Sequence, residues 1–330
     1  MIRLGAVGYL NARPLVYGLE RVPGFAIRYD IPAECARLLH AHETDVGLIP
    51  SIEYLRGPEP YAIVPGAGVT SNGPVASVAI YTRREPRDIR TIAMDSSSRT
   101  SVALATVLLR REFGVSPEPV SMAPDLETML DRADAALIIG DVALFLDHTT
   151  VRLKPDTTGD LVRLKPDTTY DDVVRLKADT TEDHVVRLKS ATTGDDSIPR
   201  EPEVALAGRS AKALAERPVS SIRKIDLGEL WTHSTGLPFV YAVWTGWQGA
   251  VGPDDVTALQ RARDQGVAHV GAVARMYYPD DPGRQAVAAR YLRDNIRYRV
   301  GDEELEGLKT FFRYAAELNL ATFDGRLRFF

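Results

Sequence analysis

Three short segments of the sequence place hydrogen-bond donors directly after predicted strands. They are residues 8–14 (Gly-Tyr-Leu-Asn-Ala-Arg-Pro), 70–73 (Thr-Ser-Asn-Gly) and 95–101 (Asp-Ser-Ser-Ser-Arg-Thr-Ser). In open α/β sheets, ligands bind just outside the carboxyl ends of strands. Because amide, hydroxyl and guanidinium groups donate hydrogen bonds, we expect the three loops to form a polar cleft that closes around a small carboxylate.

The third loop also precedes a predicted helix at 102–113. The free N–H groups and the dipole at a helix N-terminus favour an anion, and Arg99 and the neighbouring hydroxyls add further donors. The alternative is ordinary capping of the helix by Ser98 or Thr100. The agreement of three loops favours the binding interpretation.

Other candidate residues are single and weaker. Asp141 follows a predicted strand at 133–139 and either orients a ligand or caps a turn. His233 is either a surface histidine near a helix end or a base. The one cysteine, Cys35, lies in a predicted helix and is interpreted as a small apolar helix residue, so an internal disulfide is excluded.

Several classes of function have no support in the sequence. The six histidines have no metal-binding spacing, and no Walker loop, GxGxxG or GxSxG motif follows a strand, so we expect no metal and no cofactor. The formal net charge of −5 gives no basis for nucleic-acid binding. No apolar run is long enough to span a membrane, and no leader precedes the first strand, so we expect a cytoplasmic protein that does not bind membranes.

Strands, polar turns and helices alternate along the chain, which indicates an α/β fold. The 330 residues suffice for two domains. The expected helices lie at 32–43, 102–113, 254–274, 283–295 and 303–318. Apolar helix faces near the C-terminus permit a homodimer without requiring one.

The middle of the chain is a tandem repeat at 151–197. Its arginines, spaced by 11, 12 and 12 residues, are Arg152, Arg163, Arg175 and Arg187. Each copy offers few apolar groups, too few to offset the entropy of ordering it. We therefore interpret about 148–222 as an exposed insertion; a solenoid is the alternative.

Several segments along the chain form a recognisable combination. They are 5–15, 45–54, 77–81, 95–101, 138–141, 226–231 and 235–239. This combination resembles the chorismate dehydratases of the futalosine route to menaquinone. The resemblance covers about 1–147 and 223–330, and the family would have a much shorter connection in place of the insertion.

The resemblance implies a two-lobed fold of the type II periplasmic-binding-protein kind, with two crossover strands. The crossings would lie near 81–83 and 241–243. Lobe one would then be 1–82 plus 243–330, and lobe two would be 83–242, interrupted by the insertion at 148–222.

The implied activity is that of a carbon–oxygen lyase without a cofactor, which removes water from the dicarboxylate chorismate to give 3-[(1-carboxyvinyl)oxy]benzoate. We expect Asn11 to lie near the reacting ring, where it binds the leaving hydroxyl or an ordered water. No protein base is evident, so the enolpyruvyl carboxylate of the substrate would take the proton. The expected substrate-binding residues are Ser51, Ser71, Asn72, Ser97, Ser98, Arg99, Thr100, Ser101, Asp141 and Gly236.

Three alternatives stay open at this stage. A non-catalytic carboxylate-binding protein would share the fold, but we see no export signal. The sister lyase, 1,4-dihydroxy-6-naphthoate synthase, shares the fold as well, but the opening 8–14 favours the dehydratase. A sensor domain would need an accompanying DNA-binding element, which the sequence does not indicate.

Overall fold

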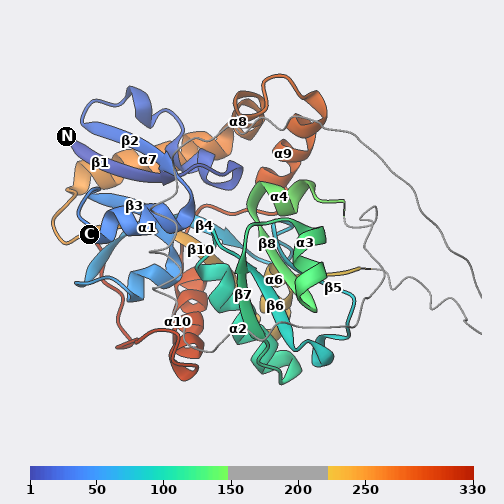
Figure 1. The fold of residues 1–330 in the computed structure, drawn as a ribbon. Helices are drawn as coiled ribbons and strands as arrows, with labels where there is room; N and C mark the ends of the chain where they lie inside the picture. The colour runs from blue at the N-terminus through green and yellow to red at the C-terminus, as the bar shows by residue number, and fades with distance from the viewer. Residues whose placement is uncertain (148–221) are drawn as a thin grey trace, which may run out of the picture. The chain divides into compact units, whose positions relative to one another are not determined.

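The computed structural model describes residues 1–147 and 222–330, which belong to one compact unit. The tandem repeats at 151–197 and all of the predicted insertion except Ile222 lie outside the described residues. The strands within the described part form two five-stranded sheets, and the helices pack around them (Figure 1). This architecture confirms the predicted α/β class.

The first sheet has the strand order β2-β1-β3-β10-β4. β1 pairs in parallel with β2 and β3, whereas β10 is antiparallel to both β3 and β4. Its strands are β1 (Ile2–Val7), β2 (Phe25–Asp30), β3 (Val46–Pro50), β4 (Tyr61–Ser71) and β10 (Phe239–Trp247).

The second sheet repeats this plan with the order β7-β6-β8-β5-β9. β6 is parallel to β7 and β8, and β5 is antiparallel to β8 and β9. Its strands are β5 (Val78–Thr82), β6 (Thr91–Asp95), β7 (Glu118–Met122), β8 (Ala135–Ile139) and β9 (Arg223–Asp226). We call the first sheet with its helices the first lobe, and the second sheet with its helices the second lobe.

The helices connect and cover the two sheets. None of those in the described part combines the length and apolar character that crossing a lipid bilayer requires. The α-helices are α1 (Pro32–His40), α2 (Thr100–Phe113), α3 (Leu126–Arg132), α4 (Gly140–Phe145), α6 (Leu227–Thr235), α7 (Pro253–Ala268), α8 (Val270–Tyr277), α9 (Pro282–Asp294) and α10 (Asp302–Glu317). The 3₁₀ helices are η1 (Leu10–Val16), η2 (Leu19–Arg21), η3 (Ser51–Leu55) and η4 (Pro86–Asp88).

The chain passes between the sheets earlier than the sequence suggested. β5 belongs wholly to the second sheet and β10 wholly to the first, so the crossings lie at 72–77 and 227–238, not at 81–83 and 241–243. The apolar runs of β5 and β10 gave no sign of which sheet they join. We therefore propose that the lobe limits lie at these two connections.

One carboxylate joins the two crossings. Asp226 accepts hydrogen bonds from the N–H groups of Val75 and Ala76 in the first crossing, at 3.0 and 2.7 Å. The same side chain caps α6 in the second crossing by accepting from Gly228 and Glu229. A single residue at the end of β9 thus fixes both connections between the lobes.

Two helical predictions change in detail. The predicted helix 254–274 is two helices, because the chain leaves helical geometry at His269. The ring of His269 bonds the carbonyl oxygen of Gln265 at 2.7 Å, and its backbone N–H bonds Gly266 instead of continuing the ladder. The helices predicted at 283–295 and 303–318 are confirmed within one or two residues as α9 and α10.

The role of Asp226 is testable by changing one oxygen. In Asp226→Asn, the amide still accepts for the α6 cap, because Asn and Asp cap helices equally well. The amide nitrogen then faces a backbone N–H that has lost its charged acceptor, so we expect the free energy of unfolding to fall by about 1.5–3 kcal/mol in urea titrations.

The matched control is Asp125→Asn. The side chain of Asp125 caps α3 through Thr128, and Thr128 is its one hydrogen-bond partner among the described residues. This control should change the free energy of unfolding by less than about 0.5 kcal/mol, as Asn replaces Asp in a cap. Equal losses in the two variants would contradict the joining role of Asp226.

Candidate functional site

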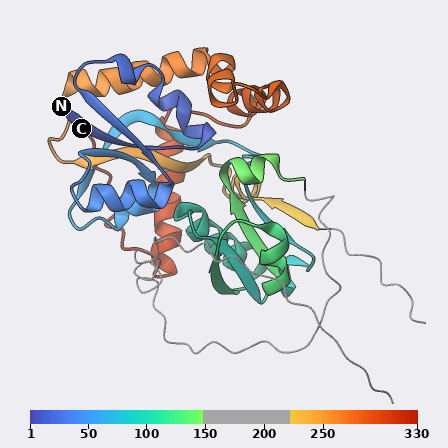
Figure 2. The same cartoon turned by 45° about the horizontal axis from the view of Figure 1, so that its top comes forward.

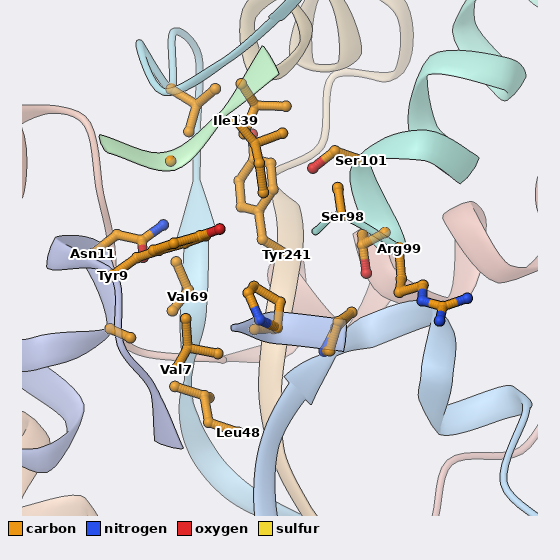
Figure 3. A pocket seen from close by; sticks show the side chains of 18 residues that line it. Val7, Tyr9, Asn11, Leu48, Val69, Ser98, Arg99, Ser101, Ile139 and Tyr241 are labelled. Carbon is orange, nitrogen blue, oxygen red and sulfur yellow. The ribbon is translucent and has the colours of Figure 1, made fainter. Parts of the chain in front are cut away.

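A pocket lies between the two sheets. Strands of both sheets and the beginning of α2 form its walls (Figure 3). The lining residues are Val7, Tyr9, Asn11, Ala12, Pro32, Leu48, Pro50, Val69, Val75, Val78, Ser98, Arg99, Thr100, Ser101, Ile139, Gly140, Tyr241 and Ala242. The walls are therefore mostly apolar, with a few convergent donors.

Asn11 lines the pocket from the first lobe. It lies in η1, which packs closely on α7: a Cβ on Gly266 of α7 would come within 2.1 Å of the Pro14 carbonyl oxygen. Only glycine permits this approach. In Figure 2 the dark blue segment that follows β1 runs beside the orange helix α7. Burial raises the pKa of Tyr291, and its hydrogen bonds with Ser77 and Asn11 partly oppose that rise. The Asn11 turn is thus packed on both sides.

The third predicted loop lines the opposite wall. Ser98, Thr100 and Ser101 are buried and face the pocket at the start of α2. No side chain caps this helix at Arg99, so its first-turn amides point toward the pocket end without a side-chain acceptor. Such an N-terminus is suited to an anion.

Arg99 has a different position from the one expected for a ligand-binding cation. Its guanidinium points away from Tyr9 and Asn11 (Figure 3). Its charge acts on Glu53 in η3, a nearly buried carboxylate. Burial would raise the pKa of Glu53, but hydrogen bonding of His40 and the charges of Arg56 and Arg99 lower it below its usual value. Arg99 therefore lines the pocket and also acts through its charge on a carboxylate of the first lobe.

Three predicted residues lie one hydrogen bond behind the walls. The Ser51 hydroxyl shares a 3.4 Å hydrogen bond with the hydroxyl of Thr100 in the wall and donates to the carbonyl oxygen of Val240 at 2.8 Å. Ser71 is the last residue of β4, not part of a loop, and its hydroxyl shares a 3.0 Å hydrogen bond with Tyr241. Ser97 accepts from the hydroxyl of Tyr9 at 3.0 Å.

The remaining predicted residues also lie outside the walls. Asp141 accepts hydrogen bonds from the N–H of Leu10 and the hydroxyl of Tyr277. Asn72 is exposed, and Gly236 is an exposed residue that ends α6 with a φ of 72°. The roles given to these residues stay predictions.

Two tyrosines that line the pocket were not among the predicted residues. The phenol of Tyr9 extends across the pocket toward Tyr241 (Figure 3). Gly140, which has a φ of 64°, leaves room for the Tyr9 ring, since a Cβ there would lie 3.1 Å from it. Burial raises the pKa of both tyrosines, so both stay neutral donors. Tyr9 stood in the first loop beside Asn11, whereas nothing in the sequence singled out Tyr241.

The described residues that line the pocket include no Asp, Glu, His or Lys. Asp95 lies behind the Ser97 turn and accepts from both the N–H and the hydroxyl of Ser97 at 2.9 and 2.7 Å. Burial raises the pKa of Asp95, and these hydrogen bonds oppose the rise. The nearest carboxylates are thus engaged in supporting the loops.

His233 is exposed in the last turn of α6, which agrees with a surface histidine. Cys35 is buried in α1, and burial raises the pKa of its thiol to about 12. Within residues 1–147 and 222–330, His, Cys, Asp and Glu side chains do not gather in groups of three or more that could bind a metal ion.

The two lobes with a pocket between them define a protein of the periplasmic-binding-protein-like fold. A Candida albicans protein with the generic periplasmic binding protein fold matches with a TM-score of 0.52 and 11% identity, over 98% of this chain and 92% of that one. A crystal structure of an Archaeoglobus fulgidus protein matches with a TM-score of 0.60 and 16% identity, over 97% of this chain and 98% of that one.

The chain belongs to the menaquinone biosynthesis family, whose model matches residues 2–164 and 212–317. It is 28% identical over 309 residues to a protein of Thermus thermophilus named chorismate dehydratase, and the match covers 93% of each chain. These findings confirm the family resemblance drawn from the sequence.

Thr100 offers a test of how the pocket walls are held together. Its hydroxyl oxygen accepts from the buried N–H of Ile52 at 3.2 Å, which joins α2 to the first lobe. In Thr100→Val this N–H loses its acceptor, so we expect the free energy of unfolding to fall by about 1–3 kcal/mol in urea titrations.

Thr106→Val is the control on the same helix. Its hydroxyl only donates to the Val102 carbonyl oxygen one turn earlier. We expect a change within about 0.5 kcal/mol. If both variants lose the same stability, Thr100 has no special part in joining the walls.

Proposed function

We propose that this protein removes water from chorismate to give 3-[(1-carboxyvinyl)oxy]benzoate. The observation that carries the proposal is the pocket that Asn11 lines from the first lobe and the α2 N-terminus lines from the second. Membership of the menaquinone biosynthesis family and the named Thermus thermophilus relative support it.

The reaction suits a pocket that positions the substrate and supplies few reacting groups of its own. Loss of a ring proton and the neighbouring hydroxyl makes the ring aromatic, so the elimination is strongly downhill. The protein must hold the substrate in one reactive orientation. Good positioning alone can lower a barrier by about 7–11 kcal/mol.

The proposed substrate orientation follows from the polarity of the walls. One carboxylate of chorismate binds at the first turn of α2, where Ser98 and Ser101 add hydroxyl donors to the amides. The ring packs against apolar walls such as Val69 and Ile139. The reacting hydroxyl then lies on the Asn11 side.

The proton is moved by the substrate itself in this proposal. The enolpyruvyl carboxylate takes the ring proton, the electrons of the C–H bond form the ring double bond, and the C–O bond breaks. The leaving hydroxide takes this proton from the enolpyruvyl carboxylic acid and departs as water, which restores the carboxylate. Asn11 donates its amide hydrogen to the leaving oxygen, while Tyr9 and Tyr241 stay neutral because burial raises their pKa values.

The experiment is to incubate the purified full-length protein with chorismate and follow the aromatic enol ether by liquid chromatography and mass spectrometry. Wild type should convert chorismate. Asn11→Ala should lower kcat by about 100-fold or more, the usual cost of losing a donor to a developing charge.

Gln248→Ala is the control, because it removes an exposed amide side chain that does not line the pocket and should leave kcat unchanged. Binding of chorismate without conversion by wild type would favour a non-catalytic carboxylate-binding protein. Conversion only of a larger substrate to dihydroxynaphthoate would favour the sister lyase. Either result contradicts the proposed function.

A further inference from the structure

Helix α4 of the second lobe carries two side chains that meet the end of α8. Asp141 and Phe145 are four residues apart and so share one helix face. The hydroxyl of Tyr277 donates to Asp141 Oδ2 at 2.6 Å. The ring of Phe145 packs edge-on against Tyr278, with 5.4 Å between centroids. Figure 1 shows α4 beside the α8–α9 region.

The other oxygen of Asp141 reaches the Asn11 turn. Oδ1 accepts from the backbone N–H of Leu10 at 3.3 Å, and Leu10 stands between the pocket residues Tyr9 and Asn11. The Tyr277 hydroxyl also lies 3.1 Å from the carbonyl oxygen of Gly8. Asp141 and Tyr277 together therefore hold the backbone of residues 8–10.

Asp141 is held by hydrogen bonds on both of its oxygens. Burial raises the pKa of Asp141, and the hydrogen bonds from Tyr277 and Leu10 and the charges of Arg13 and Arg284 oppose that rise. Asp141 does not line the pocket, although its neighbour Gly140 does. A role in direct contact with substrate therefore has no geometric support.

We propose that Asp141 is a positioning residue, which fixes the turn of residues 8–11 across the lobes and thereby sets the place of Asn11. This replaces the expectation that Asp141 binds the substrate. The inference rests on the proposed function only where turnover is measured. Its geometric part concerns the Leu10 amide and holds for any ligand of the pocket.

A double-mutant cycle tests the action through Asn11. Asp141→Asn should lower kcat for chorismate by about 10–100-fold with KM changed less than about threefold, since small displacements of a reacting group cost rate more than binding. In an Asn11→Ala background, the same change should lower kcat by less than about twofold, because the residue being positioned is gone. Multiplicative effects would overturn the proposal.

A second measurement does not depend on activity. Amide hydrogen exchange of the segment at Leu10 should become about fivefold faster or more in Asp141→Asn, because a neutral amide oxygen accepts from this N–H more weakly than the carboxylate does. Glu127→Gln removes an exposed carboxylate elsewhere in the second lobe and should leave this exchange unchanged. Unchanged exchange in Asp141→Asn overturns the proposal.

A second variant and a binding measurement distinguish a failure of the positioning role from misfolding and from a failure of the proposed function. If Asp141→Asn does not fold, Tyr277→Phe removes one hydroxyl from the same contact and should give a smaller loss of kcat in the same direction. If wild type binds chorismate without converting it, the proposed function fails. The cycle is then measured as dissociation constants for chorismate, with the same non-additivity expected and additivity again overturning the positioning role.

Discussion

The pocket depends on one carboxylate, Asp226, which ties together the two places where the chain passes between the lobes. Its oxygens accept from Val75 and Ala76 in one crossing and from the first turn of α6 in the other. The first connection joins β4 to β5 and the second joins β9 to β10, so each runs between the two sheets. The position of Asp226 therefore sets how the ends of these strands face each other. The Asn11 turn and the α2 N-terminus then reach the same space from opposite lobes.

The electrostatic character of the pocket follows from how the acids near it are used. Asp95 supports the Ser97 turn, Asp141 holds Leu10, and Glu53 faces Arg99 and His40, so none of the three lines the pocket. The polar groups of the pocket walls include amides, hydroxyls and neutral phenols. An anionic ligand therefore meets donors without a competing carboxylate, which agrees with the proposed dicarboxylate substrate.

The sequence located much of this site because loops after strands are local features. The strand 2–7, the turn with Asn11 and the helix beginning near Thr100 could each be predicted from a few consecutive residues. The strand β2 was missed although its alternating Phe25, Ile27 and Tyr29 are a period-two signal.

Long-range features could not be predicted in the same way. Tyr241 reaches the pocket, and Asp226 joins the crossings, through partners more than a hundred residues away. The sheets that β5 and β10 join could not be predicted for the same reason, since sheet membership depends on pairing between distant strands. Asn72 and Gly236 were chosen for their residue types, and the structure leaves both exposed.

The most direct test of the central claim is a crystal structure of the Asn11→Ala protein with chorismate bound. We expect a carboxylate of chorismate within hydrogen-bonding distance of the first-turn amides of α2, with the ring between Val69 and Ile139 and its hydroxyl directed toward position 11. Chorismate bound outside this pocket, or bound in it with both carboxylates away from α2, would contradict the account.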